Sequence, residues 1–530
     1  MKRFAKIACL VLVLGCLIPS APVAQEDNVT LSLDQCLRTA LENNLDLVSA
    51  RKDPLIAEQR IGESDAAFDG VIGVDGNFNQ VTADQRITGT LTDPDPINNP
   101  PLTFSDTGTF DQDRLRGNLT WSQLLGYGAT YDITVSSENT DEFSRSIQSV
   151  TNELEERLID DLNDNVTLSY SMPLLRGLGR EATQVDVLLA RSGLDISNED
   201  FRLSAIQTMK STEDAYWDLV AARAAHEVAK ESLKLAQDLY EQNKKKVEVG
   251  SLAPIDVTQA EAGVASREED VIVAEATVRN AEDNLRRFMA IPPDDPSWSA
   301  VLEPTDQPSF REEEVDVDAA IQTALDRRPE IINSRRSLRD SELSERVARN
   351  GARHSLTFDA SITPFEQERD TLVDIQNTLD DYPTSDTGLV SDGHNWSVGL
   401  TYGYTIGNKR AKANYAIARI NREKGELGVR IVEQDIRVDV RAAARAVTSG
   451  AKRVAAARAN TVLQRKNVEA EQKKYENGMS TSFEVLRIQN DLSDAQFAEI
   501  QAMLDYTKAL ADLERAKGTL LEARGLALGS

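Results

Sequence analysis

The sequence is poor in the residues from which most catalytic and metal sites are built. It has three cysteines in 530 residues, and Cys9 and Cys16 lie in an N-terminal apolar stretch. Only Cys36 remains, so neither a disulfide framework nor a Cys-x-x-Cys metal spacing can be drawn. No nucleophile–base cluster and no phosphate-binding glycine loop is present. The three histidines are far apart in sequence: His226, His354 and His394. We therefore expect no enzymatic activity, no metal and no cofactor.

Basic residues and aromatic residues are also scarce. Lysine and arginine number 59 against 87 acidic residues, which gives a formal net charge of -28. Because binding to phosphate groups requires a basic surface, nucleic acid is excluded as a partner. Aromatic residues make up 5% of the chain, while alanine, glutamate, arginine and leucine are abundant. This composition favours long packed helices over a compact enzyme.

The N-terminus has the pattern of an export signal. Lys2, Arg3 and Lys6 precede an apolar run, and a small-residue region follows that ends at Ala24, so residues 1–25 are predicted to be a signal peptide. The segment ending at Cys16 also resembles a lipoprotein cleavage box, which makes lipidation of Cys16 an alternative to ordinary cleavage. After residue 25 no run of eighteen apolar residues occurs. If the chain enters a membrane, we expect it to do so as a β-barrel.

The chain contains an internal duplication. The segment 31–41 returns as 315–325, and the glycine turn 250–257 returns as 478–485. Each half is predicted to run short helix, β segments, long helix, glycine turn and return helix. A proline-rich linker with the acidic run 312–314 joins the halves. We predict a first structural repeat over residues 26–310 and a second over residues 311–530.

Several segments alternate strictly between apolar and polar residues, which predicts strands. Examples are 72–79, 166–172, 356–363 and 396–406. The apolar face could point into a soluble sandwich or toward lipid in a transmembrane barrel, and the alternation does not separate these structures. The polar segments 81–113 and 364–393 are predicted to be exposed loops.

Long proline-free segments predict helices on either side of each glycine turn. Residues 179–249 and 408–477 would form helices of roughly 105 Å at about 1.5 Å per residue. Residues 254–289 and 483–523 would return along them, and 32–68 and 318–354 would open each half as single helices. Heptad spacing of alanine and larger apolar residues favours antiparallel coiled-coil packing. The lengths together predict a wall of antiparallel helices about 100 Å tall.

These features resemble the TolC family of outer membrane efflux proteins, over about residues 31–523. The resemblance rests on the repeated opening helix, on Met172-Pro173-Leu174-Leu175 between strand and long helix, and on the two glycine turns. It implies a mixed α and β membrane protein, in which a transmembrane β-barrel continues into a periplasmic α-helical coiled-coil barrel in a homotrimer. It also implies a channel-tunnel for efflux or type I secretion in the outer membrane, extending into the periplasm. The implied partners are outer membrane lipid, a periplasmic adaptor protein and an inner-membrane transporter.

The sequence departs from the usual family pattern in one region. Residues 115–136 contain an additional pair of alternating segments around the turn at Gly126-Tyr127-Gly128. The sequence therefore leaves undecided whether each protomer contributes four or six strands to the barrel.

The resemblance places functional residues at the two glycine turns. The implied adaptor-docking tips are Gly250, Ser251 and Leu252 in the first turn and Gly478, Met479 and Ser480 in the second. The implied periplasmic gate consists of Glu484 as a constriction ring, Arg487 as its neighbour, and Asp256 with Tyr475 as partners in a link between hairpins. Ser480 stands where a basic link residue is often found. Glu484 and Asp256 are equally well explained as acids at helix N-termini, where the dipole favours them.

Two other functional classes compete with the channel. A non-conducting coiled-coil periplasmic spacer would explain the helices, but it has no need of alternating strands bounded by Trp121, Trp396 and Tyr402. An enzyme has no support from the motifs. The sequence names no cargo, pump or adaptor.

Overall fold

The structure is a computed structural model that describes residues 28–91, 102–148, 153–376 and 385–526. The predicted signal peptide and Cys16 lie outside these residues. The chain forms two compact units, each assembled from segments that are distant in sequence. One unit comprises residues 51–201 and 329–434, and the other comprises the described parts of residues 1–50, 202–328 and 435–530. Both units draw on both halves of the sequence, and the repeat boundary at residue 310 stays a prediction.

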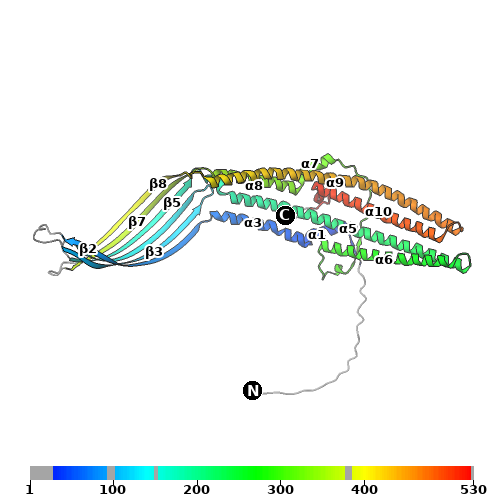
Figure 1. Ribbon diagram of the computed structural model, residues 1–530, viewed down its shortest axis with the longest axis horizontal. Helices are drawn as coiled ribbons and strands as arrows, with labels where there is room; N and C mark the ends of the chain where they lie inside the picture. The colour runs from blue at the N-terminus through cyan, green and yellow to red at the C-terminus, as the bar shows by residue number, and fades with distance from the viewer. Residues whose placement is uncertain (1–27, 92–101, 149–152, 377–384, 527–530) are drawn as a thin grey trace, which may run out of the picture. The chain divides into compact units, whose positions relative to one another are not determined.

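The first unit contains a six-stranded antiparallel sheet (Figure 1). Its strands are β2 (Val71–Leu91), β3 (Leu102–Leu124), β4 (Thr130–Gln148), β5 (Glu153–Pro173), β7 (Ser355–Gln376) and β8 (Ser385–Gly403), in that order across the sheet. The first half of the chain contributes four strands and the second half two. The additional segments at 115–136 thus belong to a six-stranded sheet, and how many of these strands enter a barrel stays a prediction.

The prediction of exposed loops over 81–113 and 364–393 was wrong for most of these residues. Strands β2 and β3 stay in register as far as the pair Leu91 and Leu102, and β7 with β8 as far as Val373 and Ser385. These segments carry polar side chains on both faces, so they lack the apolar alternation that marks a strand in sequence. Main-chain pairing holds them in the sheet all the same. Residues 92–101 and 377–384 lie outside the described ranges.

One face of the sheet carries a continuous apolar surface, here called the apolar belt. A row of paired residues crosses all six strands on this face: Ile72, Trp121, Ile133, Leu168, Ile362 and Trp396. The belt is exposed, with Val74 at 80% and Leu400 at 65% of their full accessible surface. Along β5 the apolar-face residues Val166 and Leu168 are exposed, whereas Thr167 and Ser169 on the polar face are only partly so. The apolar face is therefore the open face of the sheet, the reverse of the arrangement in a soluble sandwich.

The long helices form as predicted, and the opening helices do not. Helix α5 (Val185–Glu248), after a short α4 (Arg180–Thr183), turns into α6 (Pro254–Met289), and α9 (Lys409–Glu476) turns into α10 (Ser482–Lys517). The first opening segment is divided into α1 (Leu33–Asn43), α2 (Leu45–Ala50), α3 (Lys52–Asp65) and the short helix η1 (Ala66–Phe68). The second is divided into α7 (Val317–Arg327) and α8 (Pro329–Gly351), and Gly518 separates α10 from α11 (Leu520–Ala523). None of the helices in the described ranges is long and apolar enough to span a membrane.

Local chemistry explains these breaks. Asn44 ends α1, and its side chain accepts from the amide of Leu47 and donates to the carbonyl of Phe288, so a polar side chain replaces continued helical pairing. Arg328 precedes Pro329 and adopts an extended backbone, which ends α7. Gly518 adopts φ +73°, a left-handed conformation that terminates α10.

A strap of residues 301–311 joins the hairpins of the second unit. It begins as β6 (Val301–Pro304), which pairs in parallel with β1 (Asn28–Leu31). Asp306 then accepts hydrogen bonds from the amide of Leu33 and the hydroxyl of Tyr216, each at 2.7 Å. Further along, the carbonyl of Arg311 accepts a hydrogen bond from the hydroxyl of Tyr506 on α10. The strap thus contacts one helix of each hairpin.

Candidate functional site

The two hairpin turns have the same backbone structure. After α5, the amide of Ser251 donates to the carbonyl of Lys246 and that of Gly250 to Val247. After α9, the amides of Met479 and Gly478 donate to the corresponding carbonyls, those of Lys474 and Tyr475. Both pairs are the bonds of a Schellman motif, and Gly250 and Gly478 adopt φ +79° and +73°. No atom lies within 4 Å of a Cβ built on either glycine, so the backbone conformation alone favours glycine there.

Apolar side chains project at both turns. On the first turn Val249 and Ile255 are exposed, and on the second Met479 and Phe483 are 72% and 64% exposed. Single exposed apolar residues are common on protein surfaces, but a pair at each of two equivalent turns forms an apolar end to each hairpin. The predicted tip residues Ser251, Leu252 and Ser480 lie in the same turns.

The two hairpins are joined next to their turns by a set of hydrogen bonds, here called the tip link. The hydroxyl of Tyr475 on α9 donates to Oδ1 of Asn243 on α5. The Asn243 amide in turn donates to the main-chain carbonyl of Asp256 at 3.2 Å. The hydroxyl of Ser482 on α10 donates to the carboxylate of Asp256 at 3.0 Å. Asp256 and Tyr475 thus both lie in the link, but they do not bond to each other: Tyr475 bonds to Asn243 and Asp256 to Ser482.

Lys246 adds a charged contact to the tip link. Its ammonium donates to the main-chain carbonyl of Tyr475 at 3.1 Å and lies 3.7 Å from the centre of the Tyr475 ring. Burial, with a contribution from the carboxylate of Asp256, raises the pKa of the Tyr475 hydroxyl. The hydroxyl therefore stays protonated and donates at neutral pH. Ser480 contributes no charge and donates to the carboxylate of Glu471.

Glu484 and Arg487 form a bidentate ion pair on the first turns of α10. The guanidinium Nε lies 3.1 Å from one carboxylate oxygen of Glu484, and Nη2 contacts the other. The hydrogen bond from Arg487 lowers the pKa of Glu484, so the carboxylate is charged at neutral pH. Thr481 caps the helix by accepting from the Glu484 amide at 3.3 Å. Glu484 thus occupies a helix-start position, and a ring of such residues stays a prediction.

Sequence reasoning missed four members of the link region. Asn243 and Glu471 are buried polar residues, each seven positions before its turn glycine, and Lys246 lies four positions before Gly250. Aligning the two repeats on Gly250 and Gly478 would have placed Asn243 opposite Glu471 and drawn attention to both. Ser482 is buried at the start of α10, and no sequence signal distinguishes it from an ordinary helix-start serine.

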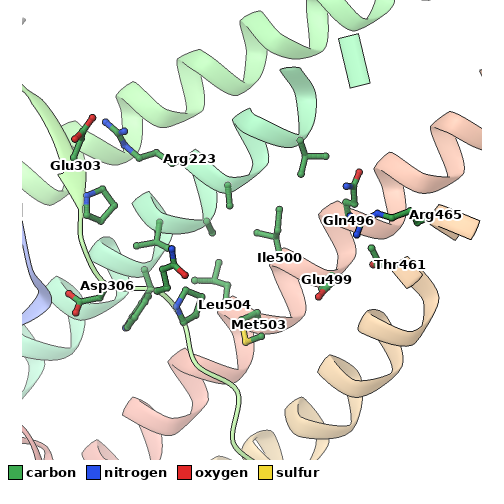
Figure 2. Close-up of a pocket in the computed structure, with 18 residues that line it drawn as sticks. Arg223, Glu303, Asp306, Thr461, Arg465, Gln496, Glu499, Ile500, Met503 and Leu504 are labelled. Atoms are coloured by element: carbon green, nitrogen blue, oxygen red, sulfur yellow. The ribbon is translucent and has the colours of Figure 1, made fainter. Parts of the chain in front are cut away.

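A pocket of about 630 Å³ lies beneath the strap (Figure 2). Its apolar wall is formed by Ile500, Met503 and Leu504 of α10, together with residues of α5. Arg223 at the rim is paired with Glu282 at 3.2 Å. The pocket lies where the strap passes from one hairpin to the other.

The chain matches one family model in sequence and a set of solved outer membrane channels in fold. The family model for outer membrane efflux proteins matches residues 142–290 and 320–519. The Campylobacter jejuni outer membrane channel CmeC is 17% identical, with 94% of this chain and 87% of that chain covered and a TM-score of 0.59. The open state of the Neisseria gonorrhoeae channel MtrE is also 17% identical, with 92% and 89% covered and a TM-score of 0.58. VceC of Vibrio cholerae is 13% identical, with 94% and 97% covered and a TM-score of 0.58. No curated protein sequence matches the chain.

Proposed function

The chain belongs to the outer membrane efflux protein family, and on that premise we propose that three copies assemble into one duct from periplasm to exterior. As a member of this family it is a non-enzymatic channel of the outer membrane that extends into the periplasm. The proposal adds that the sheets of three protomers form one transmembrane barrel, which continues as a periplasmic helical tunnel. Cargo would enter from an inner-membrane transporter joined by a periplasmic adaptor, in efflux or in type I secretion.

The sheet supports the trimer because it is open at both edges. Among the described residues, strands β2 and β8 each pair with one neighbouring strand only, in a sheet of six. A sheet inside a membrane has to close, because unpaired main-chain groups cannot be satisfied in lipid. Pairing β8 of one copy with β2 of the next closes the sheet, and three copies would supply eighteen strands.

Helix α9 offers a second surface for neighbouring copies. Ile417, Ile420, Leu427 and Ile431 are each more than half exposed and are spaced by three, seven and four residues. This is the spacing of a coiled-coil seam, which becomes stable when a partner helix covers it. We propose that a helix of the adjacent protomer packs there.

The hairpin turns are the proposed gate and docking site. The tip link would hold the hairpins in a closed position, and Glu484 with Arg487 would line the constriction around the threefold axis. The apolar side chains at the two turns would contact the adaptor. An adaptor that presents an apolar helical end would fit these turns better than an adaptor with a charged end, because the exposed side chains of Met479 and Phe483 are apolar.

The observation that carries the proposal is the exposed apolar belt, and substitutions on its two faces test it. Leu400→Arg at mid-belt should cost about 2–4 kcal/mol and reduce the amount of trimer in the outer membrane. Thr401→Arg should assemble normally, because Thr401 lies on the polar face, where its hydroxyl donates to Asp359 at 3.3 Å. Fractionation and mass measurement in detergent report both results. Equal losses, or a soluble periplasmic monomer, would favour the non-conducting spacer instead.

A further inference from the structure

Each strand of the sheet is about twice as long as a membrane crossing requires. The six strands contain 19 to 23 residues, whereas a transmembrane strand needs about 9–11. The apolar belt occupies only the part nearer the helices, for example residues 72–78 in β2, 115–121 in β3 and 396–402 in β8. Half of each strand therefore lies beyond the belt, and we call this part the outer half of the sheet.

The face that carries the belt becomes acidic in the outer half. On β7 the residues that follow Ile362 on this face include Glu366, Glu368 and Asp370. One row of paired residues places four aspartates side by side on neighbouring strands: Asp113, Asp141, Asp160 and Asp370. Charged side chains facing lipid are destabilising, so this part of the face is suited to water.

The opposite face of the outer half is hydrophilic as well. Asp161 lies 2.6 Å from Arg369 and accepts a hydrogen bond from the amide of Gln367 at 2.7 Å. Main-chain pairing continues between these strands as far as Gln148 with Glu153 and Leu154 with Gln376. The outer half is thus a regular sheet with water-compatible faces on both sides, and not a set of loops.

We propose that the outer half of the sheet stands clear of the lipid as a rigid polar tube, which carries the exit of the channel beyond the membrane surface. The inference rests on the proposed trimeric barrel. About ten residues per strand at ~3.3 Å rise and a tilt of ~40° give a tube of about 25 Å beyond the belt. Cargo then leaves above the lipid headgroups, and a polysaccharide coat on the cell would be crossed by the duct.

Apolar residues interrupt the acidic face at two levels without changing this inference. Leu162 and Val390 lie in the row of Glu368, and a second set lies beyond the aspartate row. Phe143, Leu158 and Leu372 are paired neighbours on β4, β5 and β7. They form a single row three strands wide, between the aspartate row and the row that contains Arg145, which is paired with Glu156 at 3.5 Å. A single row has less than the height of a bilayer core, so it does not make a second membrane belt.

Labelling of single cysteines on whole cells tests the position of the outer half. Cys36 is fully buried and gives no background. We expect a membrane-impermeant charged maleimide to label cysteines at Leu158 and Asp370. Cysteines at Val398 and Leu400 should react only with an apolar maleimide that partitions into lipid. Protection of the first pair from the impermeant reagent, with labelling by the apolar one, would place the outer half in lipid and overturn the inference. Labelling of all four in a soluble fraction would instead refute the barrel.

A shortened sheet tests what the tube is for. The row of Gln80, Asp113, Asp141, Asp160, Asp370 and Gly388 allows one cut across all six strands. Residues 81–112, 142–159 and 371–387 would each be replaced by an Asn-Gly hairpin turn. We expect the shortened trimer to match the full chain in efflux from cells without surface polysaccharide, and to lose efflux in coated cells. Equal efflux from both kinds of cell would show that the coat does not require the tube. The labelling result stands even if the shortened chain fails to fold.

Discussion

Removing the Tyr475 hydroxyl is the sharpest perturbation of the proposed gate. Tyr475 is 3% exposed and its hydroxyl is the donor to Asn243 Oδ1, which is fully buried. Tyr475→Phe keeps the ring and its contact with Lys246, but it leaves that oxygen without a donor in the closed state. A buried unsatisfied polar group costs about 1–3 kcal/mol. In the open state Asn243 is free to meet water, so the cost falls on the closed state.

The proposed trimer would multiply this effect. If three links open together, the closed state loses about 3–9 kcal/mol, and even the lower value shifts the equilibrium about a hundredfold toward opening. Single-channel recording in planar bilayers should therefore show a raised closed-state leak. The matched control is Tyr240→Phe, on the same helix as Asn243, because no hydrogen bond of the Tyr240 hydroxyl is found within the described residues.

A double variant separates the link from general damage. Because Tyr475 and Asn243 act through one hydrogen bond, Tyr475→Phe combined with Asn243→Ala should leak no more than the sum of the single variants, and less if they act as a unit. Equal leak from Tyr475→Phe and Tyr240→Phe would refute the reasoning, since both variants remove one tyrosine hydroxyl but only Tyr475→Phe removes the bond to Asn243.

Three further predictions concern the same unit. Glu484→Ala should lower cation selectivity and the block by multivalent cations, and Arg487→Asp should raise both, as measured in planar bilayers; unchanged values would leave Glu484 a helix-start acid only. Burial, opposed by Arg524, raises the pKa of Glu213 above its ordinary value. The folded state therefore binds this proton more tightly than the unfolded state, and stability should fall as pH rises from the ordinary carboxyl pKa to the raised one. Glu213→Gln should flatten that part of a thermal-unfolding pH profile. Gly478→Val should impair efflux at normal membrane levels because φ is +73°, whereas Gly478→Asn should impair it less.

The helical hairpins could be predicted closely because their ends carry strong local signals. Pro254 at the first position of α6 and the glycines at 250 and 478 fix where a helix begins or ends. The break after α1 depends on Asn44, whose side chain bonds to a carbonyl from α6 that is distant in sequence. No local pattern reports such a contact.

In the sheet and at the hairpin tips, prediction from the sequence failed for a different reason. The inner half of each strand alternates and was identified, but the outer half is polar on both faces and resembles a loop in sequence. At the tip, Asp256 and Tyr475 were placed in the link, yet their partners are Ser482 and Asn243. Which buried polar groups meet is decided by how two hairpins pack, and a sequence read one helix at a time does not contain that geometry.

The additional pair of strands has a consequence for molecular sieving. The circumference of a closed barrel grows with strand number, and barrels of 16–18 strands enclose an open aqueous bore. Six strands per copy give half again the perimeter that four would give. In the proposed trimer, a bore of that width would exclude little by size, so selection of cargo by diameter would fall to the hairpin turns. Conductance should then respond to substitutions at the turns far more than to bulky side chains on the inner wall of the sheet.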